Sequence, residues 1–278
     1  MNRLLIGGIA LAALIGGPAR AADMRPPPAP VTFFTWTGAY VGVNLGGGWR
    51  QPVDFVTTVA PCTDPLTCLL FAEETGVISG LGTRSGTRGK GITGGFQIGY
   101  NYQAGPVVVG VEADWEYFKR NSFLAGTAPR TFDFGLMTVT NDASSTWLAT
   151  VRGRLGLAWD RFLVYATGGV AFTDLRYIQT LTATGAVFGS ASAIAEITQT
   201  QTGPAVGGGA EYALWNNLSV RAEYLYAEFR DVSRGSFPIV SGTAFSNTFT
   251  GSTGKLHDHI VRIGLNYKFG YGAEVASY

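Results

Sequence analysis

Hydrophobic and polar residues alternate strictly near the end of the chain. Val261, Ile263 and Leu265 fall on one parity, while Arg262 and Lys268 fall on the other. Because successive side chains of a strand point to opposite faces, this pattern predicts a β-strand with one apolar and one polar face.

Seven earlier segments repeat this alternation, with the ranges 37–49, 91–103, 107–117, 146–159, 162–172, 205–214 and 218–229. Together with 260–269, they make eight predicted strands. An even number of alternating strands is what a closed antiparallel barrel requires.

The connections between these segments fall into two length classes. Tight turns lie at 103–106, 159–161 and 215–217, and long connections lie at 50–90, 120–143, 174–202 and 231–258. This asymmetry is typical of outer-membrane barrels, which have short turns in the periplasm and long loops outside the cell. The predicted fold is therefore all-β, an eight-stranded antiparallel transmembrane β-barrel with short periplasmic turns and long extracellular loops.

Composition indicates which face of the barrel meets water. Only 14% of the residues are charged, against about 25% in an ordinary soluble domain. A soluble, lipocalin-like barrel would carry many Lys and Glu on its outer face, but here the polar parity is mostly Gly, Thr, Asn and Gln. Aromatic residues gather towards the ends of the apolar parity, as in the two girdles of a membrane barrel. We therefore expect the apolar parity to face lipid and the polar parity to face the lumen.

The charged residues of the polar parity are balanced in number. The acids are Glu112, Asp114, Glu116, Glu211 and Glu223, and the bases are Arg152, Arg154, Arg221, Arg262 and Lys268. An eight-stranded lumen is just wide enough to be filled by side chains, and unpaired charges in it would carry a large desolvation penalty. We expect an interlocked ion network that closes the lumen. The alternative is that the same residues line a selective channel.

The beginning of the chain has the features of an export signal. A short apolar run follows Arg3, and alanines flank Arg20. We expect three parts: a signal peptide over 1–21, a Pro-rich N-terminal arm over 22–36 and the outer-membrane barrel over 37–278.

The chain has two cysteines, Cys62 and Cys68, with five residues between them. An exported chain meets an oxidising compartment, so we expect a disulfide that closes a small loop outside the membrane.

Candidate chemistry is weak. Gly89 and Lys90 lack the following Ser or Thr and the spacing of a P-loop. His257 and His259 flank Asp258 and would share one strand face, so a metal or hydrolase role is an alternative to a polar junction between loop and strand. We predict no catalytic, cofactor-binding or metal-binding residues, no cofactor and no enzyme activity. The net charge of +1 gives no indication of a nucleic-acid partner.

Three segments resemble a known family. They are "FTWTGAYVGVNLGGGW" at 34–49, "RAEYLYAEF" at 221–229 and "HIVRIGLNYKF" at 259–269. They are similar to the small porin-family β-barrels of alphaproteobacteria known as outer-membrane immunogenic proteins. The resemblance implies an OmpA/OmpX-like barrel in the cell outer membrane, exposed at the surface, exported by the Sec route and inserted by the barrel assembly machinery.

One feature departs from the family pattern. The chain continues past Phe269 with "GYGAEVASY", so either the insertion signal is internal or Tyr278 ends an extended last strand.

The function predicted from these observations is structural and interfacial. We expect a monomer in outer-membrane lipid that contributes to envelope integrity and whose long loops meet host or envelope surface ligands. The alternatives are a narrow porin for small solutes and a periplasmic lipocalin-like binder.

Overall fold

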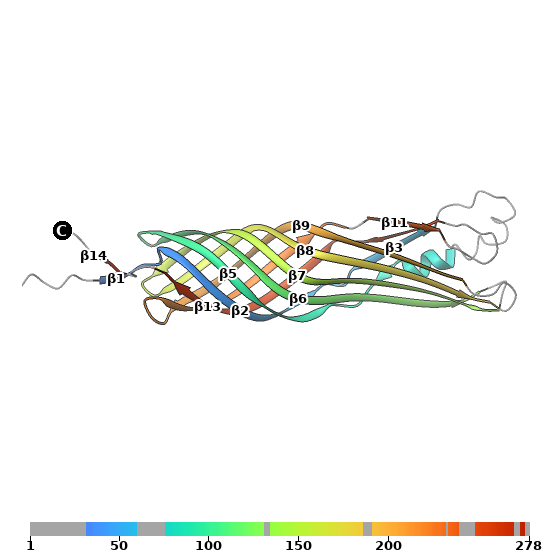
Figure 1. Ribbon diagram of the computed structural model, residues 1–278, viewed down its shortest axis with the longest axis horizontal. Helices are drawn as coiled ribbons and strands as arrows, with labels where there is room; N and C mark the ends of the chain where they lie inside the picture. Colours follow the sequence, from blue (N-terminus) through green and yellow to red (C-terminus); the bar gives the residue numbers. More distant parts are fainter. Residues whose placement is uncertain are drawn as a thin grey trace, which may run out of the picture.

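The computed structural model describes residues 32–59, 76–130, 134–185, 191–231, 233–238, 248–269 and 273–275. Within these ranges, eight antiparallel strands close into a barrel in the order β10-β13-β2-β5-β6-β7-β8-β9 (Figure 1). Their bounds are β2 (Gly38–Arg50), β5 (Lys90–Ala104), β6 (Val107–Pro129), β7 (Leu136–Trp159), β8 (Phe162–Thr184), β9 (Ala191–Ala213), β10 (Leu218–Phe229) and β13 (Leu256–Lys268). The ring closes where β13 pairs with β2, so the predicted eight-stranded barrel is confirmed.

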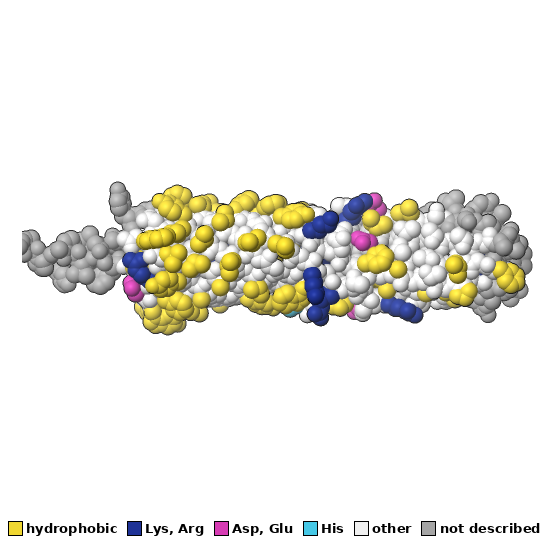
Figure 2. All heavy atoms as spheres, turned by 90° about the horizontal axis from the view of Figure 1, so that it is seen from below, with side chains coloured by type: hydrophobic (Ala, Val, Ile, Leu, Met, Phe, Trp, Pro, Cys, Tyr) yellow, Lys and Arg dark blue, Asp and Glu magenta, His cyan; other side chains and the backbone are white. Residues whose placement is uncertain are grey.

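The two faces of the wall are as the alternation predicts. Ile263 is 61% exposed on the outside, whereas its neighbour Arg262 is fully buried inside. In the face that Figure 2 shows, outward hydrophobic side chains gather over one half of the molecule and form a hydrophobic band. This band is the surface that contacts lipid.

Tight turns close the periplasmic end of the barrel. Gly105, between β5 and β6, has φ +59°, and Asp160, between β7 and β8, has φ +50°. Glycine adopts this left-handed conformation without penalty, and aspartate tolerates it better than most residues. The local sequence therefore suits the short connections that define this end.

The strands β6, β7, β8 and β9 are much longer than the alternation predicts. They contain 23 or 24 residues each, whereas a strand needs about 9 to 11 to cross a bilayer. The predicted loops at 120–143 and 174–202 are therefore wrong, because most of these residues continue the strands. The pairing register shifts between Tyr117 and Arg120 of β6 and between Ser144 and Leu148 of β7. Beyond these shifts the strands stay hydrogen-bonded to each other past the membrane.

The other four barrel strands are continued by a separate sheet. Its order is β11-β12-β3-β4, with bounds β11 (Ser233–Pro238), β12 (Thr248–Thr253), β3 (Asp54–Val59) and β4 (Arg84–Ser85). Along the chain these strands adjoin β10, β13, β2 and β5 respectively, so they repeat the barrel order. We call β3, β4, β11, β12 and the outer halves of β6 to β9 the extracellular extension.

A short helix over 76–82 belongs to this extension. Its buried residues Ile78 and Leu81 pack against Met137, Val139 and Leu181 of the long strands. No helix in the described part of the chain is long and apolar enough to span a bilayer.

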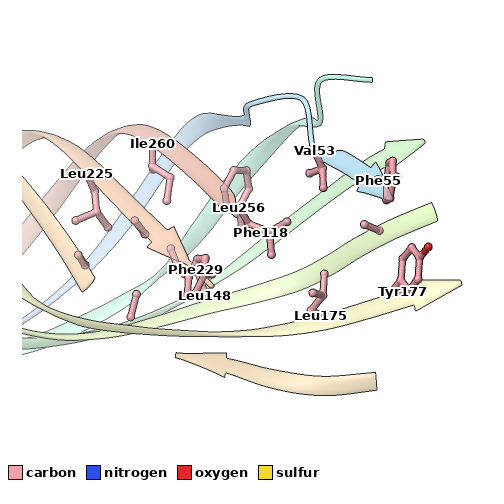
Figure 3. Packing of buried hydrophobic residues seen from close by; sticks show 14 residues of the cluster. Val53, Phe55, Phe118, Leu148, Leu175, Tyr177, Leu225, Phe229, Leu256 and Ile260 are labelled. Atoms are coloured by element: carbon pink, nitrogen blue, oxygen red, sulfur yellow. The ribbon is translucent and has the colours of Figure 1, made fainter. Parts of the chain in front are cut away.

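A second apolar cluster fills the interior where the barrel meets the extension (Figure 3). Its larger members are Val53, Phe55, Phe118, Leu148, Leu175, Tyr177, Leu225, Phe229, Leu256 and Ile260. A third cluster lies at the periplasmic mouth and comprises Trp36, Val108, Ala158, Leu163, Tyr165 and Ala213. Apolar side chains thus fill the interior at both ends of the membrane span.

Residues beyond the last barrel strand do not lengthen it. β13 ends at Lys268, and β14 (Ala273–Val275) pairs instead with β1 (Thr32–Phe34) outside the periplasmic end (Figure 1). The alternative of an extended last strand is therefore wrong. The predicted signal peptide and the pair Cys62 and Cys68 lie outside the described residues.

Candidate functional site

The candidate site is the charged interior of the barrel. Strand β6 contributes three acids, at positions 112, 114 and 116, because alternate residues point inward. In the register of β6 with β7, Glu112 lies directly opposite Arg152. The sequence therefore places opposite charges side by side without any loop to position them.

Arg152 contacts three carboxylates at once. Its Nη2 lies 2.7 Å from Glu112 and 2.7 Å from Asp114, and its Nη1 lies 3.0 Å from Glu223. Thr150 accepts a further hydrogen bond from Nε at 2.8 Å. Every donor group of this guanidinium therefore has an acceptor.

Arg262 crosses the same space from β13. Its Nη2 lies 2.7 Å from Glu223 and 3.2 Å from Asp114, and its Nη1 lies 3.4 Å from Glu116. Gly46 on the neighbouring strand β2 makes room for it, because a Cβ there would come within 2.8 Å of the Arg262 Cβ. The side chain is fully buried.

Arg221 and two tyrosines complete the centre of the network. Arg221 Nη1 donates to Glu112 at 2.5 Å. Tyr40 donates its hydroxyl to Glu112 at 2.7 Å, and Tyr165 donates to Glu223 at 2.8 Å. Both tyrosines were missed as site residues, although their inward parity could have identified them.

Arg154 and Glu211 pair closer to the periplasm. Arg154 donates to Glu211 and stacks over the Tyr165 ring at 3.6 Å from its centroid. Glu211 also accepts hydrogen bonds from Ser219 at 2.5 Å and from Asn266 at 2.8 Å. Nine of the ten residues predicted for the lumen are thus brought together by ion pairs, by the shared Tyr40 hydroxyl, or by Tyr165, whose ring contacts Arg154 and whose hydroxyl donates to Glu223.

Lys268 lies apart from the other nine. Its ammonium donates to the backbone carbonyl of Thr35 and sits 4.6 Å from the centre of the Phe34 ring. No carboxylate of the described residues lies within ion-pair distance of it. Its inclusion among the paired charges is therefore wrong, because parity predicts the face of a residue but not its depth.

Trp36, which precedes the first barrel strand, closes the periplasmic mouth. Its indole donates to the carbonyl of Asp160 at 3.1 Å, and its backbone N–H donates to Gln103 at 2.8 Å. A cavity of about 20 Å³ lies between it and the network, lined partly by Asn101 and Glu211. A space of this size holds about one water molecule.

A second buried ion cluster, formed by Arg50, Arg120 and Asp258, was not predicted. Arg50 Nε lies 2.8 Å and Arg120 Nη2 lies 2.9 Å from the carboxylate of Asp258. Arg50 and Asp258 are paired across β2 and β13. Extending the inward parity by a few residues past the predicted strand ends would have found all three.

The two clusters together are electrically balanced. The main network has four arginines and five acids, and the second cluster has two arginines and one acid, so the two clusters together hold six of each. The excess negative charge of one cluster is offset by the excess positive charge of the other.

His257 and His259 lie on the outer face instead of in the interior. Tyr226 contacts the Nδ1 of His257 at 2.7 Å, Tyr224 contacts the Nδ1 of His259 at 2.7 Å, and Trp49 stacks on His259. Within the described residues, no group of three or more His, Cys, Asp or Glu could hold a metal ion. The histidines are thus part of an aromatic cluster at the end of the hydrophobic band.

The chain is similar to known outer membrane proteins. Residues 9–269 match the outer membrane protein beta-barrel domain family. The 31 kDa outer-membrane immunogenic protein of Brucella melitensis is 32% identical over 273 residues, which cover 93% of this chain and 97% of that protein. The 22 kDa outer membrane protein of Rhizobium leguminosarum is 29% identical over 53% of this chain and 59% of its own length. Among solved structures, the outer membrane protein OprG of Pseudomonas aeruginosa aligns with a TM-score of 0.45 and 11% identity, over 84% of this chain and 97% of that chain.

Proposed function

Because this chain belongs to the outer membrane β-barrel family, we propose that it serves the envelope as a closed barrel rather than as a pore. Its location is the cell outer membrane. In the proposed role, a monomer inserted by the barrel assembly machinery contributes to envelope integrity and presents the extracellular extension to surface ligands.

The observation that carries this proposal is the filled interior. The guanidiniums of Arg152, Arg221 and Arg262 are fully buried among carboxylates. Buried ion pairs of this kind are costly to separate, because removing either partner leaves an unpaired charge in a medium of low dielectric constant. Thermal motion of the side chains is therefore not expected to open a water path.

The extension supports the proposed surface role. Its interior is filled by apolar side chains and by hydrogen bonds such as that from Gln179 to Thr57 at 2.8 Å. A surface built on continued strands holds one shape, and a rigid shape reduces the entropy lost when a ligand binds. We propose no enzymatic role, because the acids and arginines of the two interior clusters are paired with one another and buried.

Planar-bilayer recording of the purified, refolded full chain tests the proposal. We expect currents at the baseline, with an open porin recorded in the same bilayers as the positive control. Steady channels whose ion selectivity reverses in Arg152→Glu would overturn the proposal and place the protein among porins.

A complementation experiment tests the envelope role. A strain that lacks the protein should become more sensitive to detergent, and the full chain should restore resistance. Equal sensitivity of the two strains would argue against a role in envelope integrity.

A further inference from the structure

Exposed basic side chains gather where the hydrophobic band ends on the extracellular side (Figure 2). The exposed Lys and Arg of this region of the wall include Arg88, Lys90, Lys119, Arg176 and Lys255. This level corresponds to the head groups of the outer leaflet, because the band below it contacts the acyl chains.

Two of these basic residues have acidic partners. Arg176 lies 2.5 Å from Glu196, and Lys255 lies 2.8 Å from Glu228. The hydrogen bond from Arg176 lowers the pKa of Glu196, and the hydrogen bond from Lys255 lowers the pKa of Glu228. Both carboxylates are therefore ionised at neutral pH and neutralise their partners.

The other three basic residues have no such partner. No carboxylate of the described residues lies within 4.0 Å of the charged groups of Arg88, Lys90 or Lys119. Lys119 directly follows Phe118, which pairs with Thr93 of the neighbouring strand, so it lies beside the start of β5. The uncompensated positive charge is thus concentrated on the β2, β5 and β6 side of the barrel.

An open hollow lies next to these charges on the lipid-facing wall. It is a shallow depression lined by Gly47, Gly48, Trp49, Arg88, Lys90, Gly91, Ile92 and Val261. Gly47 pairs with Ile92 on one side and Val261 on the other, and both flanking side chains are exposed. A Cβ built on Gly47 would meet no heavy atom closer than 3.8 Å, so the hollow results from the missing side chain.

We propose that this surface binds the phosphorylated head group of an outer-leaflet lipid. One acyl chain lies in the hollow at Gly47, and the phosphate lies between Arg88 and Lys90. Arginine offers a planar pair of donors that matches phosphate oxygens, and lysine adds a point charge. Trp49, with one apolar and one polar edge, occupies the depth at which tryptophan is enriched in membrane proteins.

Native mass spectrometry of the full chain in detergent micelles tests the charge requirement. The probe is phosphatidic acid, a lipid with a phosphate monoester, compared with phosphatidylcholine of the same acyl chains. We expect the wild type to bind phosphatidic acid preferentially and Arg88→Gln with Lys90→Gln to bind it about 30-fold more weakly, since each basic residue near an anionic surface contributes about a factor of five. The matched control, Arg176→Gln with Lys255→Gln, also removes two exposed positive charges and should bind like the wild type.

A second pair of variants tests the hollow. Gly47→Leu fills it while leaving both basic residues in place, and should weaken binding of phosphatidic acid by at least about tenfold, the effect of losing roughly one buried acyl segment. Gly153→Leu is the control, because Gly153 also faces outward and a Cβ there would meet nothing closer than 3.8 Å. All variants are first checked for the altered electrophoretic mobility that an intact barrel shows without heating.

The outcomes separate a lipid site from simpler explanations. Equal losses in the Arg88/Lys90 and Arg176/Lys255 variants would show general charge attraction and overturn the proposal. Competition by millimolar inorganic phosphate that removes all bound lipid would show an ion site and also overturn it. Loss of binding in Gly47→Leu but not in Gly153→Leu, with phosphate ineffective, would support it.

Discussion

At the scale of single residues, Arg262 is held by the carboxylates of Asp114, Glu116 and Glu223 in a fully buried position. We predict that Arg262→Met lowers the free energy of unfolding by about 3 to 5 kcal/mol, because the mutation leaves the buried carboxylate of Glu116 without a cationic partner and removes one of the positive charges that Asp114 and Glu223 share with Arg152. Urea unfolding of the barrel in micelles, followed by tryptophan fluorescence, measures this loss.

Lys268→Met is the matched control for Arg262→Met. It removes a positive charge from the same inward parity, but Lys268 contacts only a backbone carbonyl and an aromatic ring. Its effect should be less than half as large. Equal effects of the two mutations would show that the network contributes no more than a lone lumenal charge.

The outward face of the same strand carries a second prediction. Ile263 is 61% exposed to the lipid side. Ile263→Arg should destabilise the barrel by about 2 to 4 kcal/mol near the middle of the bilayer, whereas Ile263→Leu should leave the unfolding midpoint unchanged. The measurement is unfolding and refolding in lipid vesicles. No difference between the two substitutions would contradict the assignment of this face to lipid.

The sequence could predict the face of these residues but not their partners. Alternation places Arg152, Arg262 and Lys268 on one parity, because the period of a strand is strictly two. It cannot tell that Arg262 reaches Asp114, which is far away in the chain, or that Lys268 lies at the mouth. Those contacts depend on the stagger of strands around the ring, which no local pattern encodes.

At the scale of elements, the pattern of apolar residues changes along the long strands β6 to β9. This change explains why their outer halves were not predicted as strands. Within the membrane the apolar residues of β8 face outward, as Val164 does, but beyond it apolar residues of the opposite parity, such as Leu175 and Leu181, are buried inside. Above the bilayer the outer face meets water, so Thr and Asp replace Val and Leu there, and a search for one continuous alternation stops at the change.

The helix over 76–82 allows a test of the extension independently of the barrel. Leu81 is 8% exposed and packs inside the extension, whereas a Cβ on the adjacent Gly80 would meet nothing within 4 Å. Leu81→Asp buries an unpaired charge and should make the extension at least about tenfold more sensitive to protease, which corresponds to roughly 1.4 kcal/mol of local opening. Gly80→Asp should have no such effect.

Limited proteolysis of the purified protein, followed by mass spectrometry, measures the effect of Leu81→Asp. The barrel fragment should survive with unchanged heat-modifiable mobility, because the membrane strands do not depend on the helix. Cleavage within the membrane strands would show that barrel and extension unfold as one unit.

The connection that contains Cys62 and Cys68 carries a prediction from the sequence alone. In the exported protein, alkylation without a reductant should add no mass, and alkylation after reduction should label both thiols, because the compartment is oxidising. Replacing both with Ser should leave barrel mobility unchanged, since the predicted loop is small and the described segments on either side of it, β3 and the helix over 76–82, belong to the extracellular extension. Labelling of either cysteine in the unreduced protein would contradict the bridge.

At the scale of the whole molecule, packed side chains fill the interior at three successive levels. Trp36 covers the periplasmic mouth, the ion network around Arg152 fills the middle, and the apolar cluster that includes Phe118 and Leu148 lies above it. The middle level holds charge and the flanking levels are apolar, so an ion entering from either side would have to shed water before it met a countercharge. In the proposed closed barrel, the energetic barrier to an ion is therefore distributed along the barrel rather than located in one constriction.

This distribution predicts the behaviour of a barrel from which one level is removed. Trp36→Ala opens the periplasmic mouth but leaves the network and the apolar cluster in place, so planar-bilayer currents should stay at the baseline of the wild type. The free energy of unfolding should fall by about 3 to 5 kcal/mol, the usual effect of removing a buried tryptophan. A loss of this size would confirm that the side chain is packed in the mouth. Steady conductance in Trp36→Ala would instead show that the mouth alone seals the barrel and that water already passes among the paired charges above it.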